Sequence, residues 1–376
     1  MPDTRQLETF AAGVETAVNV AQIERQLHKL WQLASDSSGQ AAESEKDPTR
    51  RAITRASLFN LMALCGTDAD RDHATETISA LTSRHPCRAI VLLAKPNESR
   101  AELSASISAH CHLAGGGRKQ VCCEQISIYA SGESTKQVGS VVLPLLESDL
   151  PTILWWQGNF LETPELFGHL VPVADRIIFH SSQWPDAPSG LAALHRVVVE
   201  RRRCVFTDLS WTRLGIWRKL TAECFDDPPA RAELARIQSV KIGYGHSLGG
   251  VVRTTLYAAW LGAQLSWSPV AASSRIHRTL QEDGPDAVTM GIISIELKSP
   301  AATFSLRKSL GEWAASATVI MPHMCTLPRK QAFAPNDDAS LLSKAFDQPG
   351  RDPVYERALA WAAALTEPEP DRLARY

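Results

Sequence analysis

Strand-like and helix-like segments alternate along the chain from residue 87 onward, and this alternation limits the possible folds more than any other feature. Residues 87–94 have the length and the β-branched content of a buried strand. Further strand-like runs lie at 124–130, 152–156 and 176–179, with helix-like stretches between them. This order predicts an α/β fold in which helices cover a mostly parallel sheet.

The pattern changes in the last third of the chain. A strand-like run at 239–244 leads to a long helical pattern at 251–265. Two further strand-like runs, 288–297 and 302–306, then flank a short turn that contains Pro300. This spacing is typical of an antiparallel hairpin. We therefore expect a second, α+β part in addition to the mostly parallel sheet.

The amino-terminal region has its own organisation. Val20, Ile23, Leu27 and Leu30 recur at helical spacing and predict an amphipathic helix. Residues 35–50 are rich in Ser, Gly, Glu and Lys, which is typical of a flexible linker. Two more helical patterns follow, around 53–65 and 74–83. The expected parts are an N-terminal helix with its linker (1–49), an α/β domain (50–235) and a C-terminal α+β domain (236–376), with a boundary near 171–175 as the alternative to 235.

Composition excludes several classes of partner. The chain has 376 residues, of which 44% are hydrophobic, so it can bury a sizeable core. Its net charge of -2 supplies no broad positive field, which makes nucleic acid and anionic membrane surfaces poor partners. The apolar runs are too short to span a bilayer, and Asp3, Glu8 and Glu15 do not suit a secretory signal. We expect a cytoplasmic protein.

The eight cysteines lack the regular spacing of a disulfide scaffold, which suits a reducing compartment and burial as small hydrophobic residues. Cys122 and Cys123 are adjacent, so their side chains should point to opposite faces of a strand and respond only weakly to redox changes. His110, Cys111 and His112 lie nearby in the sequence. Neither group has the two-to-four-residue cysteine spacing of structural zinc sites, so we expect no metal.

The pentapeptide Gly245-His246-Ser247-Leu248-Gly249 fits the G-x-S-x-G nucleophile elbow, with a strand pattern before it and a helix pattern after it. In a serine hydrolase Ser247 would be the nucleophile and His323 the base that removes its proton. The acid that orients the histidine would have to be Asp283, Asp286 or Glu296, of which Asp286 is our choice.

Two features speak against the hydrolase. Asp283 and Asp286 precede a strand instead of following one, and Glu296 adjoins the hairpin turn. The upstream run of glycines at 115–117 lacks the histidine of an oxyanion loop and is typical of a plain turn. By chance, such a pentapeptide occurs in roughly one chain in ten of this size. The hydrolase is therefore the alternative, and because no G-x-G-x-x-G follows an early strand, we expect no cofactor.

Tryptophan-rich segments stand out more than titratable ones. Trp155 and Trp156 close a strand-like run just before Gln157 and Gly158, and a W-T-R-L-x-x-W pattern begins at Trp211. This combination resembles the OpcA family of glucose-6-phosphate dehydrogenase assembly proteins, to which segments at 121–126, 174–179, 259–267 and 292–297 are also similar. The likeness extends from about residue 86 to residue 297. Gln157 departs from it, since the family often has Arg there.

The resemblance implies a protein that is not an enzyme, that binds glucose-6-phosphate dehydrogenase and that favours its active oligomer. A partner can do so only by binding the active state more tightly than the inactive one. Trp and Arg are enriched at binding hot spots, although a buried indole also serves as simple packing. Asp208 should cap the helix that follows it. The candidate partner-binding residues are Trp155, Trp156, Gly158, Asp208, Trp211, Arg213, Trp217 and Arg218.

On that helix, two apolar faces are expected. Trp211, Leu214 and Arg218 fall on one face, whereas Trp217 lies on another that is rotated away from it. One face should cover the protein's own sheet. The other either packs inside the chain or contacts the partner.

Overall fold

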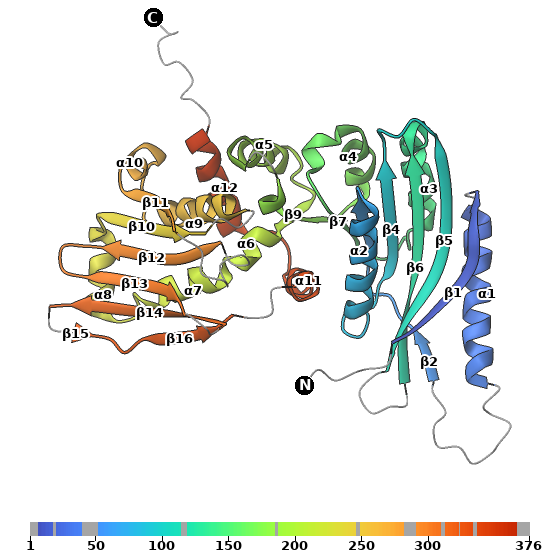
Figure 1. Cartoon of the computed structure of the whole chain (residues 1–376), viewed down its shortest axis with the longest axis horizontal. Coiled ribbons are helices and arrows are strands. Elements are labelled where there is room, and N and C mark those ends of the chain that lie inside the picture. The colour runs from blue at the N-terminus through green and yellow to red at the C-terminus, as the bar shows by residue number, and fades with distance from the viewer. Residues whose placement is uncertain are drawn as a thin grey trace, which may run out of the picture. The chain divides into compact units, whose positions relative to one another are not determined.

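The computed structural model describes residues 7–17, 20–39, 52–113, 119–184, 187–245, 249–281, 291–309, 313–322, 324–333 and 337–366. The chain forms two compact units, each built from separate segments (Figure 1). The first unit comprises Met1–Phe179, Arg203–Phe206 and Leu342–Pro349, and the second comprises His180–Arg202, Thr207–Leu341 and Gly350–Tyr376.

The first unit contains a mixed sheet with the strand order β1-β5-β6-β4-β3-β7-β8-β9, and β2 pairs with β6. The pairs β6–β4, β4–β3, β3–β7 and β7–β8 are parallel, whereas β5 is antiparallel to both β6 and β1. The strands are β1 (Leu7–Ala17), β2 (Ala52–Arg55), β3 (Asn60–Cys65), β4 (Arg88–Lys95), β5 (Glu102–Leu113), β6 (Lys119–Ser131), β7 (Thr152–Trp156), β8 (Arg176–Phe179) and β9 (Val205–Asp208).

Every residue of β3 and of β7 is buried, which accounts for their continuous apolar sequences. The parallel pairs β6–β4, β4–β3, β3–β7 and β7–β8 confirm the predicted mostly parallel, helix-covered sheet. The helical pattern at 53–65 was wrong, because these residues form β2 and β3. A short apolar run suits a buried strand as well as a helix, and here neighbouring strands on both sides supply the backbone partners of β3.

Helices α1 (Val20–Gly39), α2 (Asp68–Leu81), α3 (Val138–Val142) and α4 (Pro164–Leu170) complete this unit. Ile23, Leu27 and Leu30 are buried, as the amphipathic pattern predicted. Helix α1 runs on to Gly39, so residues 35–39 are helical and not linker. Helix α2 begins with a capping box, in which the Thr67 hydroxyl accepts a hydrogen bond from the Asp70 amide at 3.1 Å and the Asp70 carboxylate accepts one from the Thr67 amide.

The second unit contains a sheet with the order β11-β10-β12-β13-β14-β15, and β16 pairs with β14. The predicted hairpin is confirmed, since β12 and β13 are antiparallel with Lys298 opposite Thr303. The strands are β10 (Ser239–Tyr244), β11 (Ile276–Leu280), β12 (Ile292–Lys298), β13 (Thr303–Lys308), β14 (Ala314–Met321), β15 (Met324–Cys325) and β16 (Arg329–Ala332).

The remaining helices are mostly short. Helix α9 is buried along almost its whole length and packs against α12 and α5. Among the residues that the structure describes, no helix has the length and apolar character needed to cross a membrane. The helices are α5 (Ala187–Glu200), α6 (Leu209–Arg213), α7 (Gly215–Glu223), α8 (Pro228–Glu233), α9 (Gly250–Gln264), α10 (Pro269–Ser273), α11 (Asp338–Asp347) and α12 (Pro353–Thr366).

Candidate functional site

The double tryptophan belongs to the core of the first unit. Trp155 and Trp156 are each only 2% exposed. The Trp156 ring meets Phe160 nearly edge-on with centroids 6.0 Å apart, and Phe160 stacks on Phe167 at 5.0 Å. Just past the strand, Gly158 is exposed and has a φ of 88°, a conformation that glycine adopts without strain. The two indoles therefore pack the fold, and Gly158 lies at the surface.

Asp208 ends β9 and caps α6, as predicted. Its carboxylate accepts hydrogen bonds from the Ser210 amide at 2.8 Å and from the Ser181 amide at 3.1 Å, and it also accepts the Ser181 hydroxyl. Burial raises the pKa of Asp208, although the hydrogen bonds from Ser181 and Ser210 oppose this shift. These contacts join α6 to the segment after β8 within the second unit, so Asp208 has a structural role.

Trp211 is held on several sides within the second unit. Its indole nitrogen donates to Asp352 at 2.8 Å, and the guanidinium carbon of Arg218 lies 3.6 Å from its ring centroid. The Tyr355 ring packs beside it at 5.4 Å. Burial lowers the pKa of Arg218 to about 10, against the opposing charge of Asp352, so this guanidinium stays charged at neutral pH. Trp211 and Arg218 share a face as predicted, and that face is used inside the unit.

The helix expected from residue 210 onward is two helices, because α6 ends at Arg213 and α7 begins at Gly215. Trp217 is buried beside Phe333, with ring centroids 5.9 Å apart. Arg213 donates to Asp338 at 3.2 Å, and burial lowers its pKa. Both apolar faces are thus occupied within the chain. Contact with a partner through this segment stays a prediction, and it would have to use the half-buried Arg213 and Arg218 instead of the indoles.

The predicted nucleophile elbow lies between β10 and α9. Ser247, His323 and Asp286 lie outside the described residues, as does Asp283. The remaining acid candidate, Glu296, is on β12 with its carboxylate 3.1 Å from the Lys298 ammonium.

The last glycine of the elbow has a structural explanation. Gly249 has a φ of 80° and lies directly against Ser182, so that a side chain there would overlap the Ser182 side chain and carbonyl. Ser182 shares a hydrogen bond of 3.0 Å with the Nε2 atom of His180. Burial, followed by the charge of Arg213, lowers the pKa of His180 to about 3. The imidazole beside this turn is therefore neutral at physiological pH.

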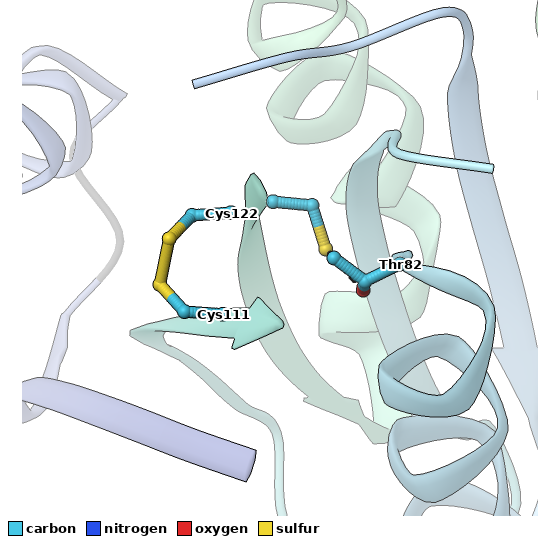
Figure 2. Close-up of a disulfide and its surroundings, with 4 residues drawn as sticks. Thr82, Cys111 and Cys122 are labelled. Carbon is cyan, nitrogen blue, oxygen red and sulfur yellow. Dashed lines mark hydrogen bonds between the residues drawn. A yellow bond between two sulfur atoms is a disulfide. The ribbon is translucent and has the colours of Figure 1, made fainter. Parts of the chain in front are cut away.

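Cys111 and Cys122 form a disulfide between β5 and β6 (Figure 2). They lie directly opposite each other, with Cα atoms 4.1 Å apart. Cys123 points to the other face of the strand, as expected for adjacent residues, and its sulfur is 2.9 Å from the Thr82 hydroxyl. The spacing of the cysteines did not predict this pairing. The available signal was the run of glycines at 115–117, because Cys111 and Cys122 are about equally far from it.

The other cysteines mostly agree with the expected role as small hydrophobic residues. Cys65, Cys87, Cys123, Cys204 and Cys224 are free and buried, whereas Cys325 is exposed. Within the described part of the chain, no three His, Cys, Asp or Glu side chains gather where they could hold a metal ion.

Comparison with known proteins shows the family. One family model, the glucose-6-phosphate dehydrogenase subunit N-terminal domain of the OpcA type, matches residues 78–196, and the corresponding C-terminal domain matches residues 204–359. Together they match well over half of the chain. It belongs to the OpcA family. The double tryptophan and the W-T-R-L-x-x-W segment lie in the N-terminal and C-terminal OpcA domains, respectively.

Two curated OpcA proteins are similar in sequence, and both are named putative OxPP cycle protein OpcA. The protein from Nostoc punctiforme is 31% identical over 189 residues, which is 50% of this chain and 40% of that protein. The protein from Synechocystis is 30% identical over 207 residues, or 55% and 42%. The match thus covers less than half the length of either relative.

A solved structure, that of the aldose-aldose oxidoreductase from Caulobacter crescentus, is similar in fold over 82% of this chain and 96% of the oxidoreductase chain. Its TM-score is 0.41 at 12% identity, which is too slight a likeness to bear on function.

Proposed function

We propose that this OpcA-family chain binds glucose-6-phosphate dehydrogenase as a non-catalytic assembly factor and allosteric activator, favouring the active oligomer in the oxidative pentose phosphate pathway. The observation that carries the proposal is the pair of consecutive family matches, both described as domains of a glucose-6-phosphate dehydrogenase subunit. The names of the two curated relatives, which refer to the OxPP cycle, support the same pathway.

Activation requires no chemistry on the part of the binder. If the chain binds the active oligomer more tightly than the inactive form, mass action shifts the population, and the shift cannot exceed the difference in affinity. A preference of 1.4 kcal/mol already changes the ratio about tenfold. Linkage is reciprocal, so any other ligand that favours the active oligomer must also raise the affinity of the dehydrogenase for this chain.

The contact that we propose lies on the α6–α7 segment. Arg218 rests on Trp211 and is held there, and Arg213 is held by Asp338, so both guanidinium groups are positioned before any partner arrives. Groups ordered in advance lose less entropy on binding. Arg is also among the residue types enriched at hot spots.

Co-elution of the two purified proteins tests the proposal directly. The chain and the dehydrogenase from the same organism are mixed at equal concentrations and separated by size-exclusion chromatography, with each protein followed by mass spectrometry. We expect a shared, earlier peak and higher dehydrogenase activity in it than in the dehydrogenase alone. Separate elution at micromolar concentrations, with unchanged activity, would refute the proposal.

The contact itself is tested with Arg213→Ala and Arg218→Ala, and with Lys219→Ala as the matched control. Lys219 is exposed on α7, the helix that also carries Arg218, and within the described part of the chain its ion pair is a long one with Glu223, at 3.7 Å. Stimulation reduced about tenfold by an arginine variant that is still fully folded at the assay temperature would support the contact. Normal stimulation by both arginine variants would place the contact elsewhere on the chain.

A further inference from the structure

A polar cleft of about 520 Å³ lies on the first unit, beside the first two turns of α2. Leu93 and Lys95 of β4 and Tyr129 of β6 place it toward the carboxyl ends of these two parallel strands. Ligands of open α/β sheets bind outside the carboxyl ends of the strands. The volume lies within the range of small-molecule sites, which is about 300–1,000 Å³.

Figure 1 shows that the sheet continues beyond α2 to β6 and β5, and residues of these two strands line the cleft. Helix α2 packs on β3 and β4. It lies on the Gln125 face of β6, since the Gln125 amide donates to Thr75 of α2 at 3.1 Å. Helix α1 lies on the opposite face, where the Trp31 indole donates to Glu124. The side chains of β5 and β6 on the α2 face therefore line the cleft next to α2.

Small hydroxyl side chains stand on that face where a packed sheet would have apolar residues. Ser106 of β5 is directly opposite Ser127 of β6, and Ser104 is opposite Tyr129. Their neighbours Ala105, Ile107 and Ile126 are buried on the other face, as strand alternation requires. The chain thus presents apolar residues to one side of these strands and hydroxyl groups to the cleft.

Gln125 and Ser104 are the two polar residues of the cleft whose hydrogen bonds bear on ligand binding. Gln125 is fixed in orientation, because its amide nitrogen also donates to Ser127 at 3.0 Å and its oxygen pairs with His110 at 3.1 Å. Ser104 is only 8% exposed, and its hydroxyl has no hydrogen-bond partner among the described residues. Leaving a buried hydroxyl unpaired costs stability. A ligand that pairs with it would remove that cost.

The charges around the cleft are balanced. The Lys95 ammonium is 2.8 Å from Asp68 and 3.6 Å from Glu98. Arg71 pairs with Asp68 at 2.9 Å, and Glu102 adds a further carboxylate to the lining. An anionic ligand would face these carboxylates, and a cationic ligand would face the lysine and the arginine. A neutral molecule whose groups both donate and accept hydrogen bonds suits this lining.

We propose that the cleft binds a small polyhydroxylated molecule of about the size of a monosaccharide, with Ser104, Ser106 and Gln125 among the groups that meet its hydroxyls. Each sugar hydroxyl can accept from a serine or an ammonium and donate to a carboxylate or an amide oxygen. The proposal does not depend on binding to the dehydrogenase, since all of these residues belong to the first unit.

Titration calorimetry on the full chain tests this, with D-glucose, D-glucose 6-phosphate and inorganic phosphate as separate probes at up to about 10 mM, where a ligand with a Kd of 1 mM occupies most sites. We expect saturable binding of at least one sugar and none of phosphate. Glucose should bind at least as tightly as glucose 6-phosphate, because the balanced charges of the lining suit a neutral ligand, and clearly tighter binding of the phosphorylated sugar would overturn the proposal. Binding of phosphate alone, or of none of the three, overturns the proposal.

The variants locate the site. Ser104→Ala should weaken sugar binding at least fivefold while leaving the melting temperature equal to or above that of the parent, because it removes an unpaired hydroxyl. Ser106→Ala is the second probe of the cleft. The matched control is Ser148→Ala, an exposed serine outside the cleft lining, which should bind as the parent does. Unchanged affinity in both cleft variants overturns the assignment.

Discussion

The guanidinium carbon of Arg218 lies 3.6 Å from the centroid of the Trp211 ring. The opposite end of the same indole donates to Asp352, whose other oxygen accepts the backbone amides of Val354 and Tyr355 at the start of α12. Trp211 therefore joins α7 to the first turn of α12 within the second unit. These contacts stabilise the second unit, so the W-T-R-L-x-x-W segment has a structural role that does not depend on a partner.

Replacing this tryptophan should destabilise the protein strongly. Trp211→Ala removes a large buried side chain, and we expect a loss of about 3–5 kcal/mol in the free energy of unfolding. Arg218→Ala removes the stacked cation, for which we expect about 1–2 kcal/mol. Urea unfolding monitored by circular dichroism measures both.

The exposed neighbour provides the control for these two variants. Lys219→Ala should change the free energy of unfolding by no more than about 0.5 kcal/mol. If Trp211→Ala unfolded at the same urea concentration as the parent, the packing role of the indole would be wrong.

Substitutions at Gly249 and Ser247 of the G-x-S-x-G segment should differ in their effect on stability. Gly249→Ala introduces a side chain at a φ of 80° and against Ser182, so we expect a loss of about 2 kcal/mol or more. Ser247→Ala removes a single hydroxyl group, so it should stay within about 1 kcal/mol of the parent. Thermal melts of the two variants distinguish these results.

The same serine variant tests the hydrolase alternative. With a reactive short-chain ester as substrate, neither the parent nor Ser247→Ala should show turnover above buffer. If the parent hydrolyses the ester and the variant does not, the serine hydrolase hypothesis would be supported instead.

Stability should fall on mild acidification because of His180. Burial lowers the pKa of this imidazole from 6.5 to about 3, and the nearby Arg213 and Arg253 oppose its charging while Asp338 favours it. The unfolded chain therefore binds the extra proton first, and stability declines as the pH falls from about 6.5 toward 3.

Between pH 7 and pH 5.5 the expected loss is about 1 kcal/mol. His180→Gln should flatten this part of the pH profile, whereas the exposed His277→Gln should retain it. A profile of the His180 variant that matches the parent's slope would show that another group is responsible.

The cysteines should react very unevenly. Burial raises the pKa of Cys65, Cys204 and Cys224 to about 12, so these thiols stay protonated, whereas Cys325 is exposed. Brief alkylation of the native protein followed by peptide mass spectrometry should label Cys325 and leave Cys111 and Cys122 linked. Rapid labelling of the last two without reductant would contradict the disulfide.

Reduction should have a limited effect. The disulfide closes a short loop, with a sequence separation of 11, so its loss should cost at most about 3 kcal/mol in the free energy of unfolding.

Since Cys122 and Cys123 face opposite sides of β6, we expect stimulation of the dehydrogenase to survive mild oxidation. A large loss that a dithiol reductant restores would count against this expectation.

The parallel strands and the late hairpin could be predicted from the sequence for a physical reason. Strands buried on both faces are continuous apolar runs, as at 87–94, and a proline-containing turn between two such runs indicates a hairpin. Strand β5 has no continuous apolar run and was missed, although the alternation of its polar residues with apolar ones such as Ala105 and Ala109 is itself a strand signal. Without β5, neither the Cys111–Cys122 pairing nor the cleft could be expected.

The candidate site shows the same limit. The spacing of Trp211 and Arg218 predicted a shared helix face, which was correct despite the break at Leu214. Periodicity could not reveal what covers that face, because Asp352 is 141 residues away in the sequence. Contacts over such separations are set by tertiary structure, and only the fold shows that the indoles are buried.

The central claim is that this chain shifts the dehydrogenase toward its active oligomer, and sedimentation velocity of the dehydrogenase measures this most directly. Across a dilution series, with and without an equimolar amount of the chain, we predict that the larger species persists to at least about tenfold lower dehydrogenase concentration when the chain is present, as a preference of 1.4 kcal/mol requires. Specific activity measured in the same samples should follow the fraction of that species. Identical sedimentation profiles with and without the chain, across the whole series, would contradict the account.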